Sequence, residues 1–321
     1  MGTVAALDPA GIPTARPRRR TRRIVAMALV AVVVGALLTV ALPYRRQIVS
    51  YLTHWKGSPR HTEAYVPFDP DAEPGFHVAV LGDVGDSGSR LDATARAVAA
   101  IDADDPFDAV LLLGDNVYPA GDPAGLQATV FDPFAPELDH GAELFAILGN
   151  HDVKDGHAEA QMRALDMPGR WWARTFGDVL VVGLDSTSTD DPAQRAWLER
   201  TLEHSDAQWK IVAVHHPPYS AGYQGSDDAV REQFAPLFAR HGVQLVLSGH
   251  EHDYQRSEII DGVTYVVTGG AAGTRRTGER NFTAVSFSWH HFVDLHVFAD
   301  RAVLRAVNQD GRVADDIVLS P

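Results

Sequence analysis

The strongest constraint on the fold is a series of short apolar runs that recur along the chain after residue 75. They are rich in Val, Leu and Ile and are bounded by Gly, Asp or His, which is typical of buried strands. We predict strands at seven of these runs: His77–Leu81, Ala109–Leu113, Leu144–Leu148, Val179–Leu184, Ile211–Val214, Val243–Leu247 and Val263–Val267.

Helical patterns lie between several of the predicted strands. The apolar residues of Ser89–Asp102 share one helical face, and Ala193–His204 and Ala229–His241 also fit a helical period. Strands that alternate with helices predict an α/β layered fold. Between Phe282 and Leu319 the apolar residues alternate instead, with a turn at 308–311, which predicts antiparallel strands. A mixed two-sheet sandwich flanked by helices fits both halves.

Side chains that can bind metal ions follow five of the predicted strands. The five loops are Gly82-Asp83, Gly114 to Tyr118, Gly149 to Asp152, His215 to Tyr219, and Ser248 to His252. In an open α/β sheet, ligands gather at the carboxyl ends of the strands. A single Gly-Asp pair is usually a turn, but five consecutive loops of this kind predict one shared site. Ten of the 15 histidines lie outside these loops, and His77, for example, needs no special role.

In chain order the five loops read GD, GDxxY, GNHD, VxxH and GHxH, which resembles the five-block signature of the calcineurin-like metallophosphoesterases. The second block, GDNVY at residues 114–118, resembles the purple acid phosphatase branch. The resemblance covers about residues 76–270. It implies a four-layer α/β/β/α sandwich of two mixed β-sheets flanked by helices. It also implies a metal-dependent phosphoric ester hydrolase, similar to acid phosphatases, that hydrolyses phosphate monoesters with two metal ions.

Residue by residue, the resemblance implies two metal sites that share one carboxylate. The first ion would be held by Asp83, Asp115, Tyr118 and His252, and the second by Asp115, Asn150, His215 and His250. Ordinary members of the family have an Asp-x-His first block, whereas this chain has Asp83-Val84-Gly85, and Tyr118 is positioned to replace the missing histidine. A phenolate suits Fe(III), and ligand chemistry leaves Fe(II), Zn(II) and Mn(II) open for the second ion.

The same resemblance implies a mechanism and three catalytic candidates. Two ions about 3.5–4 Å apart would clamp a phosphoryl group and acidify a water that attacks phosphorus. His151 would hydrogen-bond the phosphate or protonate the leaving group, and Asp152 would either orient His151 or cap the loop. Better-known members carry a further histidine beyond the fifth-strand ligand, which this chain lacks. His216 is the adjacent candidate acid, and packing away from the site is its favoured alternative.

The N-terminal region predicts a membrane signal. Ile24–Leu42 is an uncharged apolar run of nineteen residues, which reaches bilayer-spanning length. Residues 1–46 hold eight arginines and one acid, so positive-inside bias places the N-terminus in the cytoplasm. We expect a basic cytoplasmic leader at 1–23, a single-pass signal anchor at 24–42, a linker at 43–74 and an extracytoplasmic catalytic domain at 75–321. Cleavage after the weak small-residue site Thr39-Val40-Ala41 would instead give a secreted protein.

Composition excludes several classes of function. The chain has no cysteine, so disulfides, iron–sulfur clusters and cysteine nucleophiles are excluded. Its formal charge of −14 argues against nucleic acid as the main partner. The substrate that the resemblance implies is a small phosphate ester. The alternatives are a phosphodiesterase acting on nucleotides or cell-envelope diesters and, less favoured, a non-catalytic surface-anchored binding protein. The excess of arginine over lysine suggests a GC-rich bacterial genome.

Overall fold

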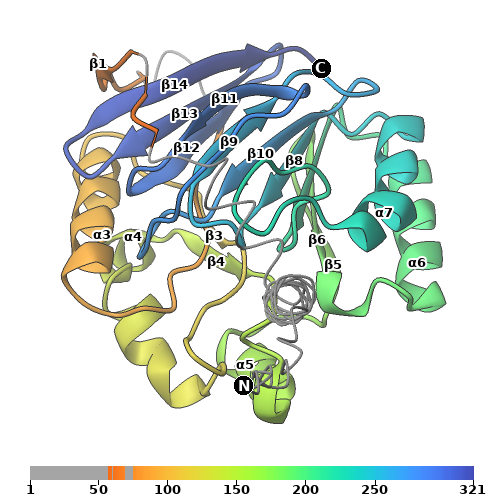
Figure 1. Ribbon diagram of the computed structural model, residues 1–321, viewed down its shortest axis with the longest axis horizontal. Helices are drawn as coiled ribbons and strands as arrows, with labels where there is room; N and C mark the ends of the chain where they lie inside the picture. The colour runs from red at the N-terminus through yellow and green to blue at the C-terminus, as the bar shows by residue number, and fades with distance from the viewer. Residues whose placement is uncertain (1–56, 60, 69–74) are drawn as a thin grey trace, which may run out of the picture. The chain divides into compact units, whose positions relative to one another are not determined.

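The computed structural model describes residues 57–59, 61–68 and 75–321 of the chain (Figure 1). The predicted leader and anchor lie outside the described residues, as does most of the predicted linker. Among the residues that are described, no helix has both the length and the apolar character needed to cross a membrane.

The first of two seven-stranded sheets combines the first strands after residue 75 with the C-terminal tail. Its strand order is β1-β14-β13-β12-β2-β3-β4. The parallel strands are β2 (Phe76–Leu81), β3 (Ala109–Leu112) and β4 (Glu143–Ala146). The antiparallel strands are β12 (His291–Val297), β13 (Ala302–Asn308), β14 (Arg312–Leu319) and β1 (Glu63–Ala64). The antiparallel tail is therefore confirmed.

The second sheet has the order β11-β9-β10-β8-β7-β6-β5. Its parallel centre consists of β6 (Val179–Leu184), β7 (Trp209–Val214), β8 (Leu245–Ser248) and β10 (Thr264–Thr268). Antiparallel strands flank this centre: β5 (Trp172–Phe176) on one side, and β9 (Tyr254–Ser257) and β11 (Thr283–Phe287) on the other. All seven predicted strands are present in the two sheets, and their bounds differ from the prediction by no more than two residues.

Helices cover the outer faces of both sheets. The longer helices are α3 (Ser89–Asp102), α6 (Pro192–Glu203) and α7 (Asp228–Arg240), and two short ones are α4 (Ala135–His140) and α5 (Ala158–Ala164). Single turns lie at Pro123–Gly125, Gln127–Phe131, Lys154–Gly156 and Ser186–Ser188. Asp191 caps α6 by accepting a hydrogen bond from the Ala193 N–H, and Asp227 caps α7 through the Val230 N–H. Both helices therefore start one residue before the predicted position.

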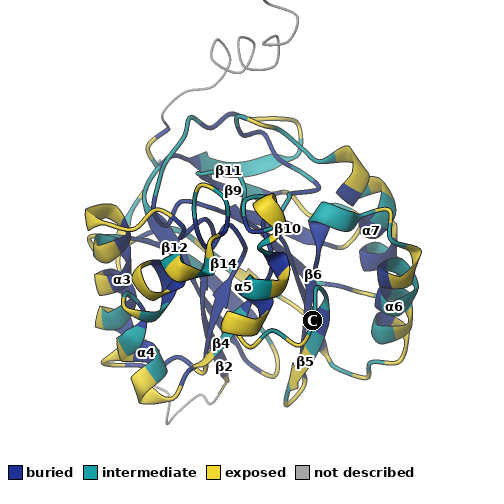
Figure 2. Cartoon of the chain, turned by 90° about the horizontal axis from the view of Figure 1, so that it is seen from below, coloured by how far each residue is buried: buried dark blue, intermediate teal, exposed yellow. Residues whose placement is uncertain are grey.

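Three apolar layers hold the sandwich together, and the buried interior is visible in Figure 2. One layer lies between the sheets and contains Val80, Leu111, Ile211, Leu247 and Leu295. A second layer packs α3 on the first sheet, and a third packs α6 and α7 on the second sheet. The predicted α/β sandwich of two mixed sheets with flanking helices is confirmed.

Candidate metal centre

The motif loops leave their strands at one edge of the sandwich through strained backbone. Asp83, Asp115 and His250 have φ values of 61°, 54° and 69°, a left-handed region that side-chain-bearing residues rarely adopt. Hydrogen bonds within the site hold this geometry: Asp83 Oδ2 accepts from the His250 N–H at 2.7 Å, and Asp115 Oδ1 accepts from the His151 N–H at 2.8 Å. Such strain persists only where the surroundings impose it, and it commonly marks a functional site.

Three of the predicted ligands of the first ion meet closely. The Tyr118 hydroxyl donates to Asp83 Oδ1 at 2.8 Å and lies 2.9 Å from His252 Nε2. His252 Nε2 is itself 3.2 Å from Asp83 Oδ1. Burial and the charges of Asp83 and Asp115 raise the pKa of the Tyr118 phenol well above its usual range, so without a cation the phenol keeps its proton. A phenol, a carboxylate and an imidazole thus share one small volume.

A second group forms around His215, whose ring is completely buried. Its Nδ1 lies 2.8 Å from the Leu113 carbonyl oxygen, which turns Nε2 toward Asn150 Oδ1 at 3.2 Å and Asp115 Oδ1 at 3.5 Å. Burial would lower the pKa of His215, but the Asp115 carboxylate outweighs this effect and the pKa rises to about 9. The imidazole also holds the pKa of Asp115 well below its usual range, against the effect of burial.

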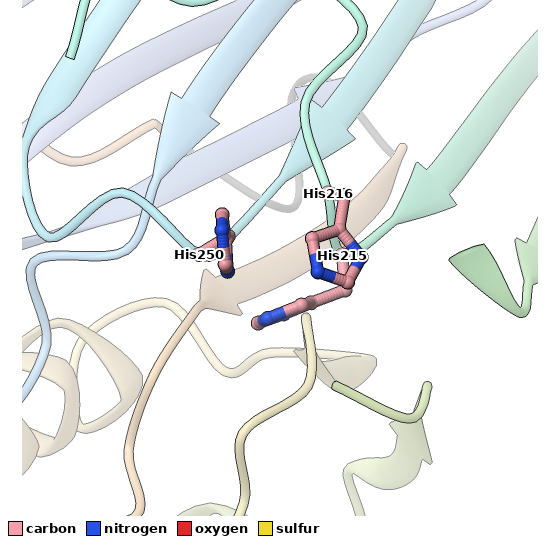
Figure 3. Close-up of side chains that lie close together, drawn as sticks. All are labelled: His215, His216 and His250. Atoms are coloured by element: carbon pink, nitrogen blue, oxygen red, sulfur yellow. The ribbon is translucent and has the colours of Figure 1, made fainter. Parts of the chain in front are cut away.

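The two groups are contiguous. Asp83, Asp115 and His215 each place a potential ligand atom within 4.8 Å of the others. His250 completes the second group, with its ring centroid 5.1 Å from that of His215 (Figure 3). Burial, and then the charge of His215, lower the pKa of His250 to about 2, so its imidazole is neutral and can offer a lone pair. All seven side chains predicted to bind metal therefore lie together at this edge.

Asp152 is not placed to orient His151. It is fully buried, and its carboxylate accepts hydrogen bonds from the backbone N–H groups of Gly149, Asn116 and Val117. The side-chain amides of Asn116 and Gln161 add further bonds. No hydrogen bond from His151 to this carboxylate is found in the described part of the chain. Of the two predicted roles, orienting His151 is thus not supported, and Asp152 instead ties the second and third motif loops together.

His151 stands at the partly exposed side of the site. Its Nε2 lies 3.9 Å from Asp115 Oδ2, and its Nδ1 lies 2.6 Å from the Pro119 carbonyl oxygen. Lys154 places its Nζ 2.8 Å from the same Nδ1. Lys154 was not predicted as a site residue, although its position three residues after His151 in a chain with few lysines was a usable signal. The positively charged side chain of Lys154 therefore lies beside His151, the residue predicted to contact the substrate phosphate or leaving group.

His216 does not point away from the site, contrary to the favoured alternative. Its ring centroid is 4.3 Å from that of His250, and its Nδ1 lies 2.8 Å from Ser186 Oγ. The three rings of His215, His216 and His250 form one cluster (Figure 3). Burial, and then the charge of His215, lower the pKa of His216 to about 4. Packing against His250 places the His216 imidazole at the site, which the sequence alone did not indicate.

Glu251 is a further residue that sequence reasoning missed. It sits between His250 and His252, is fully buried, and accepts hydrogen bonds from the backbone N–H groups of Gln224 and Gly225. It therefore anchors the loop that follows β7, the fifth predicted strand, where better-known members of the resembled family carry their extra histidine. Only its place inside the GHEH motif could have indicated this role.

Comparisons with known proteins agree with this geometry. The model of the calcineurin-like phosphoesterase family matches residues 76–254, more than half of the chain. The chain is 29% identical over 238 residues to purple acid phosphatase 17 of Arabidopsis thaliana, covering 63% of this chain and 70% of that protein. It is 25% identical over 250 residues to tartrate-resistant acid phosphatase type 5 of Oryctolagus cuniculus, covering 65% and 77%.

A solved structure supports the fold. Purple acid phosphatase from seeds of yellow lupin (Lupinus luteus) superposes with a TM-score of 0.67 at 18% identity, over 80% of this chain and 55% of that one. At this identity the superposition bears on the fold alone, while the family model and the relatives carry the assignment. The chain therefore belongs to the calcineurin-like phosphoesterase family of metal-dependent hydrolases, in its purple acid phosphatase branch.

Proposed function

We propose that the chain hydrolyses phosphate monoesters with a pair of metal ions, Fe(III) beside Tyr118 and Fe(II), Zn(II) or Mn(II) in the second position. The observation that carries this proposal is the meeting of Tyr118, Asp83 and His252 within 2.8–3.2 Å, directly beside the group around His215. A phenol, two buried carboxylates and several imidazoles form a donor set that fits hard and borderline cations.

The residues would divide into two ligand sets. The first ion would be held by Asp83, Asp115, Tyr118 and His252, and the second by Asp115, Asn150, His215 and His250. When bound, such an ion pair supplies an acidified water and positive charge for the phosphoryl oxygens. The Leu113 carbonyl fixes the direction of the His215 ring, and the low pKa of Asp115 keeps that carboxylate anionic.

His151 and Lys154 are the groups placed to meet the substrate. The His151 side chain is 25% exposed, so it can exchange protons with solvent and with a leaving group. The ammonium group of Lys154 beside it favours the approach of an anionic ester. His216 is the poorer proton donor at neutral pH, because its pKa of about 4 leaves it uncharged.

The decisive test is hydrolysis of a chromogenic phosphomonoester by protein stripped of metal and then reloaded. We expect no turnover in the stripped protein, recovery on reloading with iron, and a visible tyrosinate-to-iron absorption band that is lost in Tyr118→Phe. Tyr219→Phe is the matched control, because Tyr219 packs against Tyr265 at 4.6 Å between ring centroids, outside both ligand sets. Full activity in metal-free protein would refute the proposal.

Assays on the same purified protein distinguish two other candidate functions from the proposed one. A phosphodiesterase would hydrolyse a diester such as bis(p-nitrophenyl) phosphate faster than the monoester. A non-catalytic surface-anchored binding protein would take up metal yet turn over neither substrate. We favour the monoesterase because both relatives named above are acid phosphatases.

We also propose that Ile24–Leu42 anchors the enzyme in the cell membrane with its catalytic region outside the cytoplasm. The proposal rests on the length of the apolar run and on the arginines before it. Fractionation and protease shaving of intact cells test it. We expect the full chain in the membrane fraction and its catalytic region cleaved from outside, whereas recovery in the cytosol would contradict the proposal.

A further inference from the structure

A second cluster of imidazoles and carboxylates lies at the other end of β2, away from the motif loops. It consists of His77 on β2, His296 on β12, Asp105 in the connection from α3 to β3, and Asp294, also on β12. Six residues separate His77 from Asp83, which corresponds to about 20 Å along an extended strand. The cluster is therefore remote from the candidate catalytic centre.

The cluster is buried but leaves polar atoms without partners. His77, Asp105, Asp294 and His296 are between 1% and 5% exposed. His77 Nδ1 and Asp105 Oδ2, which both lie inside the cluster, have no hydrogen-bond partner among the described residues; His296 Nδ1 is also unpartnered, but it is the other nitrogen of that ring that faces Asp105. Buried polar atoms are almost always satisfied, so several unpartnered atoms in one place call for a ligand or an ion.

The spacing of the donor atoms suits a cation better than a hydrogen bond. Asp105 Oδ1 lies 3.6 Å from His77 Nδ1, and Asp105 Oδ2 lies 3.6 Å from His296 Nε2. Both distances exceed the usual hydrogen-bond range of about 2.7–3.2 Å. A tetrahedral ion with bonds of about 2.0–2.2 Å separates neighbouring donor atoms by about 3.3–3.6 Å. The carboxylate thus sits between two imidazoles at the separation that an ion would set.

Asp294 places a carboxylate behind one of the imidazoles, as is common around metal-binding histidines. Its Oδ1 lies 2.6 Å from His77 Nε2, the nitrogen opposite the one that faces Asp105. A carboxylate bonded to the far nitrogen of a ligating histidine fixes the ring and increases its basicity. The ring of Phe107, with its centroid 4.0 Å from that of His77, covers the cluster on one side, and Phe68 covers His296 with a centroid distance of 4.8 Å.

We propose that His77, Asp105 and His296 bind a divalent transition-metal ion such as Zn²⁺, separate from the catalytic pair, that ties β2, β12 and the α3–β3 connection together. Two imidazoles and one carboxylate leave a fourth position for water, and the donor set suits zinc. The ion would offset the charges of Asp105 and Asp294 inside a buried region.

The competing arrangement has a proton in place of the ion. Asp105 Oδ1 lies 3.6 Å from His77 Nδ1 and Asp294 Oδ1 lies 2.6 Å from His77 Nε2, so a proton on this imidazole would offset carboxylate charge in place of the ion. Arg305 is the nearest competing positive charge. It is held to Asp316 at 3.3 Å, and its guanidinium carbon lies 4.1 Å from the centroid of Phe68. Metal content distinguishes a bound ion from a proton.

The test is metal content per chain in full-length protein produced with added zinc and dialysed against a weak chelator. We expect His296→Gln to contain one equivalent of zinc less than the parent, with hydrolysis of a phosphomonoester changed by less than about twofold. His140→Gln is the matched control, because this imidazole lies 2.5 Å from Asp102 outside the cluster and should leave the zinc content unchanged. At a hundredfold excess over the dissociation constant of this site, added zinc should raise the melting temperature of the parent by about 5–10 °C more than that of His296→Gln, which keeps the catalytic pair.

Equal zinc contents in the parent and His296→Gln would overturn the proposal, whatever the chain hydrolyses. Circular dichroism shows whether the variant is folded, and Asp105→Asn replaces it if it is not. Anomalous diffraction from parent crystals grown with zinc needs no variant. It should give a peak between His77 and His296, and its absence at full zinc loading would refute the site directly. Failure of phosphate-ester hydrolysis would leave these results intact, because none depends on the catalytic pair.

Discussion

Gly149→Ala tests how tightly Asp115, the proposed bridging carboxylate, is positioned. A Cβ added at Gly149 would lie 2.2 Å from both the backbone nitrogen and the Oδ1 atom of Asp115. Ordinary contact for such a carbon begins at about 3.4 Å, so Asp115 or the GNHD loop must move by roughly 1 Å. A misplacement of that size in a reacting geometry costs on the order of 10²-fold in rate. The overpacked loop should also lose about 1–3 kcal/mol of unfolding free energy.

The assay is kcat for a chromogenic phosphomonoester together with metal content and urea denaturation. We expect kcat to fall about a hundredfold in protein that remains folded, with weakened retention of at least one metal. Gly169→Ala is the matched control, because its Cβ would meet only the Trp171 carbonyl oxygen at 3.5 Å. If Gly149→Ala kept kcat within about threefold of the parent, Asp115 would not need its observed position, and our placement of the bridging ligand would be wrong.

Three further substitutions test other parts of the structure. Asp152→Asn should cost about 1–3 kcal/mol in urea denaturation, because its amide cannot accept all the N–H bonds that the buried carboxylate accepts. Burial raises the pKa of Glu137 to about 7, and neither of its carboxylate oxygens has a partner among the described residues. The stability that the neutral form of Glu137 contributes is fully present below pH 4.5 and is lost as the pH rises through about 7. Glu137→Gln, which stays neutral, should therefore unfold at a higher temperature than the parent at pH 8 but not at pH 4. Asp315 on one sheet binds the half-buried Arg256 on the other, at 2.7 and 3.1 Å. Asp315→Ala removes this partner and should lower the free energy of unfolding by about 3 kcal/mol. A loss below about 1 kcal/mol would contradict a structural role for the pair.

The central strands and their ligand loops could be predicted because each signal is local. An apolar run such as Val179–Leu184 is buried on both faces, so its pattern survives without knowledge of its neighbours. β5 and β9 escaped prediction because β5 is exposed over much of its length and β9 carries Gln255 and Arg256. Their strand conformation comes from pairing with β6 and β10, which is a tertiary effect.

Side-chain partners were less predictable than strands. Two roles were predicted for Asp152, orienting His151 or capping its loop, and neither indicated its bonds to Asn116 and Gln161. For His216 the alternative of packing away from the site was favoured over a role as acid, because nothing in its own loop shows that Ser186 and His250 approach it. The sequence indicates which residue types can donate or accept, whereas the choice among donors depends on which loops the sheet order brings together.

The two imidazole–carboxylate clusters, which lie at opposite ends of β2, differ in how far the sequence could predict them. The proposed metal ligands at its carboxyl end can be recognised in the sequence, because each lies in a short loop directly after a strand, and four of the five loops contain a glycine. His77, Asp105 and His296 lie within regular strands or a short connection, and no local motif joins positions so far apart in the chain. This difference also predicts how the clusters behave. Ligands on strained loops, such as Asp83 with its φ of 61°, should respond to substitution mainly through the reaction rate, since the strain is maintained by the site itself. Ligands fixed by paired strands should respond through stability, because the register of His77 opposite His296 is set by the ladder between β2 and β12. A substitution in the His77 cluster that lowered the rate without lowering the melting temperature would contradict this division.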